Sequence, residues 1–185
     1  MKEKREKVLS EGKGRNKFMW IAIAVVLIGG IAYVFASGTL TQAGLLAGVS
    51  AQELEPMDYK DIRVDKQVVT SVESGDLVGV KISDLEKYRM VYFRYNSKPI
   101  LVYADQYGNI VASIAMCEPC RNEDEFFIQD NILVCGKCFT KWALGNHQGI
   151  SGGCKNYPPE IIEHTVSGGN VFVKKSDIDN WRPRV

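Results

Sequence analysis

The chain has 185 residues, of which 45% are hydrophobic and 24% charged, so it can hold one ordinary domain plus a separate segment and is not disordered throughout. The net charge of +1 hides an uneven distribution. Residues 1–17 carry seven Lys or Arg against three Glu, whereas residues 37–185 carry sixteen basic against nineteen acidic residues. This balance argues against nucleic-acid binding, which needs a basic face on the folded domain itself.

Residues 18–36 form an apolar run of nineteen residues without a charge, FMWIAIAVVLIGGIAYVFA. As a helix this run would match the thickness of a hydrocarbon core, with Trp20 and Tyr33 near its two ends, where aromatic side chains favour the membrane interface. All the basic flanking residues precede it. The pattern therefore predicts a single-pass membrane protein, with residues 1–17 as a basic cytoplasmic tail and the C-terminal part extracytoplasmic.

A cleaved signal peptide is the alternative, because small residues follow the apolar run at residues 36–38 and 49–51. Nineteen apolar residues are more than the usual signal core contains, which favours an uncleaved anchor. Residues 37–59 are small and polar with a few leucines, and we predict a linker there. Residues 60–185 are then expected to form the extracytoplasmic domain.

From residue 67 the apolar residues recur with a period of two, which predicts a mostly β domain of short strands and tight turns. A short helical turn, capped by Ser83, is expected at residues 83–87. Strands are expected at 68–70, 78–82, 91–95, 100–103 and 110–116, turns at 96–99 and 105–109, and a last hairpin at 161–173.

Two Cys-x-x-Cys motifs stand in the second half, Cys117-Glu-Pro-Cys120 and Cys135-Gly-Lys-Cys138, separated by fourteen residues. Each motif is expected to form a tight turn, or knuckle, and the sequence between them predicts a β-hairpin around residues 129–131 that returns the second knuckle to the first. Four thiolates would then meet at one point, which predicts a metal centre.

The spacing leaves the metal open. Zinc would close a tetrahedral tetrathiolate and make the centre structural, whereas an iron–sulfur cluster needs the same four thiolates and transfers electrons. Copper(I) also favours thiolates, usually fewer of them. Disulfide pairing is the alternative if the domain faces an oxidising compartment.

Three further residue types lie near the motifs. Cys154 follows a Gly-Gly pair and is a candidate fifth ligand, a replacement ligand, a redox-active side group or a free cysteine without a role. Phe139 and Trp142 are expected to cover the centre with apolar surface. His147 and His164 are the only histidines, and each is more often a core or surface residue than a ligand or a donor to one.

The sequence offers no catalytic constellation. Neither knuckle is followed by histidine, which argues against covalent c-type haem, and neither motif opens a helix of a βαβ unit as in thioredoxin-like proteins. Ser151 does not stand in a nucleophile elbow, and the glycines form no dinucleotide fingerprint. We therefore expect an electron-transfer or metal-binding protein rather than a stand-alone enzyme.

Residues 91–162 resemble the FtrD-like membrane iron–sulfur proteins. The resemblance rests on Val91-Tyr-Phe93, on the strand ending in Met116-Cys-Glu-Pro-Cys120, on Leu133-Val-Cys-Gly-Lys-Cys138 and on Gly152-Gly-Cys154 followed by prolines. It implies a membrane-anchored protein with an iron–sulfur or similar cysteine-bound centre, associated with ferrous-iron uptake.

A fainter resemblance to Rieske ferredoxins covers residues 133–173: a knuckle, an apolar pair, a Gly-Gly loop, prolines and a final hairpin occur in the Rieske order. Where Rieske centres use histidines, this chain has Cys120 and Cys138. The fold class expected is a small Rieske-like or zinc-ribbon-like β domain with two Cys knuckles, tethered by one transmembrane helix.

Together these features predict an extracytoplasmic metal-centre protein for iron–sulfur electron transfer linked to iron uptake. Its metal ligands are predicted among Cys117, Cys120, Cys135, Cys138 and Cys154. The expected partners are the membrane and a metal permease or redox protein. The alternative is a structural zinc module that binds a partner or delivers a metal ion without a redox role.

Overall fold

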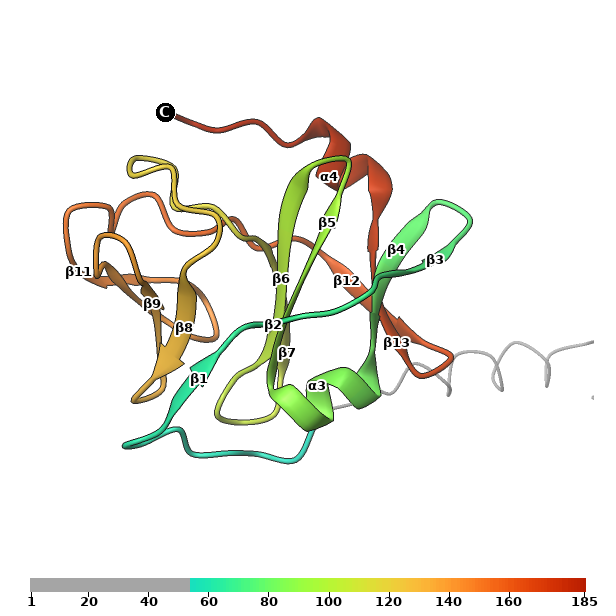
Figure 1. The fold of residues 1–185 in the computed structure, drawn as a ribbon, viewed down its shortest axis with the longest axis horizontal. Coiled ribbons are helices and arrows are strands. Elements are labelled where there is room, and N and C mark those ends of the chain that lie inside the picture. The colour runs from blue at the N-terminus through green and yellow to red at the C-terminus, as the bar shows by residue number, and fades with distance from the viewer. Residues whose placement is uncertain (1–53) are drawn as a thin grey trace, which may run out of the picture. The chain divides into compact units, whose positions relative to one another are not determined.

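A computed structural model describes residues 54–185, which form a mostly β domain, as the alternating sequence predicts (Figure 1). The predicted anchor, residues 18–36, lies outside the described residues, as does most of the predicted linker, 37–59. Among residues 54–185 no helix is long and apolar enough to cross a membrane. Within the end of the predicted linker, Leu54 and Tyr59 are buried in the domain.

The described residues contain thirteen short strands and two short helices. In chain order these are β1 (Arg63–Asp65), β2 (Gln67–Val68), β3 (Val72–Ser74), β4 (Leu77–Lys81), α3 (Ile82–Tyr88), β5 (Met90–Tyr95), β6 (Lys98–Ala104), β7 (Ile110–Ile114), β8 (Phe126–Gln129), β9 (Ile132–Cys135), β10 (Lys141–Ala143), β11 (Gly149–Ser151), β12 (His164–Ser167), β13 (Asn170–Lys174) and α4 (Lys175–Asn180).

The strands form three sheets. The central sheet has the order β2-β5-β6-β7, with β2 parallel to β5 and the other pairs antiparallel. A five-stranded sheet, β1-β8-β9-β10-β11, lies on one side of it and a four-stranded sheet, β12-β13-β4-β3, on the other (Figure 1).

The central sheet is buried on both faces because alternate residues of a strand point to opposite sides. In β6, Ile100, Val102 and Ala104 enter a core shared with β4, β13 and both helices. Leu101 and Tyr103 of the same strand enter a second core, which also contains the cysteines. The cysteines thus lie on one face of a sheet that is covered on both sides.

Three two-residue hairpin turns set the strand registers. Both turn residues have positive φ in each of them: Asn96-Ser97, Asp130-Asn131 and Gly168-Gly169. This conformation matches the twist of the flanking strands, and Asn, Asp and Gly tolerate it best. The predicted hairpin between the knuckles is therefore present as β8 and β9.

Several local expectations are wrong in detail. Helix α3 starts earlier than the predicted turn, so that Lys81, without a side-chain bond, and not Ser83 is its N-cap. The turn after β5 is shorter than predicted, and Pro99 lies within β6 opposite Arg94. Helix α4 has no counterpart in the sequence expectation, since its six residues are too few for a helical period to show.

Candidate metal centre

All five cysteines are free thiols that lie together beside the second core. The sulfur of Cys117 is 3.8 Å from that of Cys138, and the sulfur of Cys120 is 3.7 Å from that of Cys135. The sulfurs of Cys117, Cys120, Cys138 and Cys154 all lie within 4.8 Å of one another. The structure therefore brings every predicted cysteine to one place.

The two knuckles share a residue of left-handed backbone conformation at the same position. In each, the residue directly after the second cysteine has a positive φ, 52° at Arg121 and 57° at Phe139. Backbone bonds close both turns, from Arg121 N–H to the Glu118 carbonyl at 3.2 Å and from Phe139 N–H to the Cys135 carbonyl at 2.8 Å. This turn presents two cysteines of one motif to the same point.

Side chains two residues beyond each knuckle hydrogen-bond the sulfurs. Buried Asn122 donates from Nδ2 to the Cys135 sulfur at 3.2 Å. Buried Thr140 places its hydroxyl 3.2 Å from the Cys138 sulfur, and the same oxygen accepts the Cys154 N–H at 3.2 Å. Sequence reasoning missed both residues. Their equal spacing from Cys120 and Cys138 is the signal that could have revealed them.

Hydrogen bonds concentrate negative charge on one thiol. The Cys117 thiol and the backbone N–H groups of Lys137 and Cys138 lower the pKa of Cys135 to about 4, against the opposing effect of burial. Burial raises the pKa of Cys120 to about 12, and the hydrogen bond to Cys135 raises that of Cys117. Cys135 is thus the first of these three sulfurs to ionise, as a metal ligand must.

The Gly-Gly loop brings Cys154 close to the knuckles. Gly152 has a φ of 102°, and a Cβ there would lie 2.6 Å from the Thr140 Cα, so only glycine fits this approach. The close contact explains how a residue sixteen positions after Cys138 reaches the same cluster. Gly153 has open space around it, so a side chain would fit at that position.

The sulfurs offer two overlapping sets of four. A tetrahedral ion with metal–sulfur bonds of about 2.3 Å needs sulfur separations of about 3.8 Å, close to those observed for the two pairs. The compact set of Cys117, Cys120, Cys138 and Cys154 suits one such ion. The pairs Cys117–Cys138 and Cys120–Cys135 suit two metal ions that each take one pair, as in a two-iron cluster. Thiolate chemistry fits either metal.

A buried carboxylate lies inside the first knuckle. Glu118 is 1% exposed, and Arg184 from the C-terminal segment donates to it from Nε at 2.7 Å, from Nη2 and from the backbone N–H. Arg184 also donates to the Pro158 carbonyl at 2.7 Å, in the segment that follows Cys154. One arginine therefore ties the first knuckle to the Cys154 loop.

The apolar cover differs from the expectation. Trp142 is fully buried in the second core, with its indole N–H donating to the Lys155 carbonyl at 3.2 Å. Phe139, in contrast, is 68% exposed, so the prediction that it belongs to the apolar cover of the centre is wrong. Phe139 is also the residue of left-handed backbone conformation that ends the second knuckle.

His147 is a buried core residue and no sulfur is among its hydrogen-bond partners. Its Nδ1 lies 2.6 Å from the Pro159 carbonyl and therefore carries the proton, while Nε2 lies 2.6 Å from the Tyr103 hydroxyl. Burial lowers the pKa of His147 to about 4, although the bond to Pro159 acts in the opposite direction. Burial also lowers the pKa of half-buried His164.

These shifts predict that the domain loses stability in mild acid. Below pH 6.5 the unfolded chain protonates its histidines while folded His147 stays neutral down to about pH 4. Stability should therefore fall by about 2 kcal/mol between pH 7 and pH 5. Urea unfolding at both pH values measures the loss, and His147→Gln should remove most of this slope. An unchanged slope in the variant would contradict the assignment.

These features define a β-rich protein with a cluster of cysteines that could hold a metal ion. The chain belongs to the FtrD-like family, since the model of the family "Membrane iron-sulfur containing protein FtrD-like" matches residues 80–185. None of the curated proteins matches the chain.

Solved structures similar to the chain include ferredoxins and a Rieske protein. The structure titled "Complex of reduced oxygenase and oxidized ferredoxin in carbazole 1,9a-dioxygenase" is 18% identical with a TM-score of 0.47, over 55% of this chain and 95% of that one. The Rieske protein PetC3 of Synechocystis PCC 6803 is 17% identical with a TM-score of 0.44, over 57% and 99%. The ferredoxin of Sphingomonas yanoikuyae B1 is 12% identical with a TM-score of 0.45, over 52% and 94%.

Proposed function

We propose that the domain holds an iron–sulfur cluster and serves as an electron-transfer protein. The observation that carries this proposal is the arrangement of the sulfurs in two close pairs, Cys117 with Cys138 and Cys120 with Cys135. Two irons would each take one pair. Membership of an iron–sulfur family supports the same conclusion. A bound cluster accepts and donates one electron, and the surrounding protein sets its reduction potential.

Residues around the cysteines would adjust the reduction potential of the cluster. Asn122 donates a hydrogen bond to one ligand sulfur, and the Thr140 hydroxyl lies beside another, which favours the more negative, reduced state. Buried Trp142 and Leu133 exclude water from the inner side of the centre. The charge of Glu118 is balanced by Arg184 and so adds little net charge beside the sulfurs.

The location and the biological role are also part of the proposal. The charge-free residues 18–36 and the basic residues before them support a single-pass anchor with the domain outside the cytoplasm. Protection of this domain from external protease in intact cells would contradict that orientation. The FtrD-like resemblance supports a role beside a ferrous-iron permease or its redox partner.

A structural zinc site is the second candidate. It is favoured by the compactness of the other set, Cys117, Cys120, Cys138 and Cys154, which suits one tetrahedral ion. The domain would then bind a partner or deliver a metal ion without redox chemistry.

Reduction of the anaerobically purified full-length protein separates the two. We expect a brown protein whose visible absorption bleaches with dithionite and returns on mild oxidation, because thiolate-to-iron charge transfer depends on the iron oxidation state. A colourless protein that contains only zinc would contradict electron transfer.

A further inference from the structure

Cys154 is a fifth thiol beside a centre that needs four. Its sulfur lies within 4.8 Å of three others, those of Cys117, Cys120 and Cys138. Cys135 does not belong to this compact set. Four sulfurs around one ion are about 3.8 Å apart, so Cys154 needs only a small shift to bind the same metal as its three neighbours. It is therefore placed where it can take the position of a ligand that dissociates.

Hydrogen bonds from distant residues hold the Cys154 segment at the centre. The Thr140 hydroxyl accepts the Cys154 N–H at 3.2 Å and lies 3.2 Å from the Cys138 sulfur. The carbonyl groups of the two prolines that follow accept bonds from Arg184 and His147, at 2.7 and 2.6 Å. The fold thus fixes the position of Cys154 through residues both before and after it in the chain.

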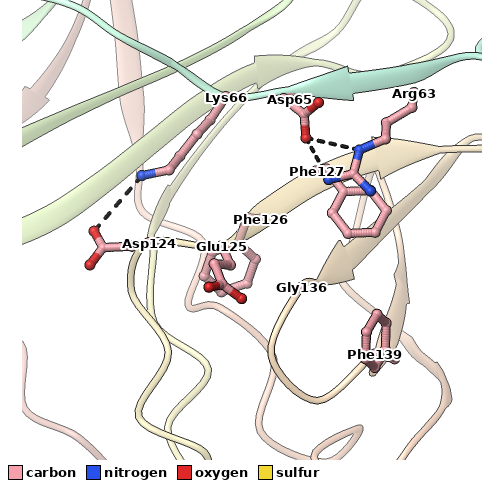
Figure 2. Close-up of a pocket in the computed structure, with 9 residues that line it drawn as sticks. All are labelled: Arg63, Asp65, Lys66, Asp124, Glu125, Phe126, Phe127, Gly136 and Phe139. Carbon is pink, nitrogen blue, oxygen red and sulfur yellow. Dashed lines mark hydrogen bonds and ion pairs between the residues drawn. The ribbon is translucent and has the colours of Figure 1, made fainter.

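The ligands that Cys154 could replace include the two most accessible cysteines. Cys120 and Cys138 are half-buried, whereas the other three cysteines are buried. The outer side of the second knuckle borders a surface hollow of about 330 Å³, lined in part by Gly136 and Phe139 (Figure 2). Accessible thiolates are the ones that oxidants and competing chelators reach first. A buried thiol therefore lies next to the two ligands that are lost most readily.

We infer that Cys154 is a reserve ligand, which binds the metal when Cys120 or Cys138 dissociates from it. The four knuckle cysteines are the resident ligands. In the exchange, the bond from the metal to the leaving sulfur breaks and a bond to the Cys154 sulfur forms, while the Cys154 proton passes to the leaving thiolate. Charge and oxidation states stay the same. The inference rests on the proposed function only for the identity of the metal.

Tethering explains why such a ligand would be effective. Cys154 is part of the same chain and held beside the centre, so its effective concentration there is high. It should bind a partly released metal before a chelator from solution does. The centre would then survive the temporary loss of one accessible ligand.

Alanine variants of single ligands test this role, because alanine offers no atom to the metal. We expect Cys120→Ala and Cys138→Ala each to retain about half or more of the wild-type iron and sulfide, and to retain less than about a tenth once Cys154→Ala is added. Cys135→Ala is the matched control, since Cys135 lies outside the compact set. It should lose the cluster whether or not Cys154 is present. Iron and acid-labile sulfide are measured in the full-length proteins, loaded without oxygen.

A second measurement leaves the resident ligands intact. Loaded wild type and Cys154→Ala are mixed with an excess of an iron(II) chelator, and the coloured iron complex is followed with time. Cys154→Ala should release iron about fivefold faster or more, because a partly released ion is no longer recaptured. Ile128→Val removes one methyl group from the same core and controls for looser packing. It should release iron at the wild-type rate.

Loss of metal by Cys154→Ala alone would overturn the inference, because Cys154 would then be a resident ligand. So would equal metal content in the single and double alanine variants, complete loss from both folded single variants, or equal rates of release from wild type and Cys154→Ala. If the single variants do not fold, the rates of release decide. A zinc-only wild type would contradict electron transfer, and zinc content and zinc release in the same proteins would then test the reserve ligand separately.

Discussion

Cys135→Ser is expected to lose the metal and to lower the midpoint of thermal unfolding by about 10 °C or more, because the binding free energy of a cysteine centre is also folding free energy. In an iron–sulfur protein Cys135 completes the second close pair with Cys120. Serine cannot supply the thiolate. Metal content and thermal unfolding of the purified variant measure both effects.

Cys154→Ala is the matched comparison, because Cys154 belongs to the compact set but to neither of the two close sulfur pairs. If two irons occupy the pairs, this variant keeps its metal. If one ion occupies the compact set, the outcomes reverse, and Cys154→Ala loses metal while Cys135→Ser retains it. Retention of full metal by Cys135→Ser would therefore contradict the iron–sulfur assignment.

Arg184→Ala should destabilise the domain by about 2–3 kcal/mol, which is below the full cost of breaking a buried ion pair because the Arg184 side chain is 40% exposed. The variant leaves the Glu118 carboxylate, between Cys117 and Cys120, buried without the guanidinium, although the backbone N–H of residue 184 can still donate to it. We therefore also expect faster transfer of the metal to a chelator. Urea unfolding and the rate of metal release measure the two effects.

Arg182→Ala is the control for this variant, since Arg182 bonds only carbonyls of its own segment, those of Asp179 and Trp181. Adding Glu118→Gln to Arg184→Ala should restore part of the stability, because the buried charge is then gone. An effect of Arg182→Ala as large as that of Arg184→Ala would show that the C-terminal segment acts only by general packing.

The sequence predicts well what is local in the chain. Apolar residues that recur with a period of two identify the strands of the central sheet, because successive side chains enter opposite cores. Ile100 and Val102 enter the first core, and Leu101 between them enters the second. The hairpin between the knuckles follows from Asp130 and Asn131, which tolerate the turn's positive φ. Both cysteine motifs are visible because each forms within four residues.

Features that depend on distant segments escaped prediction. Arg184 and Glu118 lie 66 positions apart in the sequence, and no sequence pattern in either segment predicts that they form an ion pair. The approach of Cys154 depends on how Gly152 packs against Thr140, which only the folded structure fixes. Phe139 was expected to cover the centre because it is hydrophobic, but its side chain is exposed at the surface. Which of the five thiols bind metal remains a prediction.

Whether an iron–sulfur cluster occupies the cysteine centre is decided by the iron and acid-labile sulfide content of the full-length protein, purified without oxygen. We predict iron and sulfide in equal amounts, as in a two-iron, two-sulfide cluster, with negligible zinc. One zinc ion per chain without sulfide would contradict the presence of an iron–sulfur cluster.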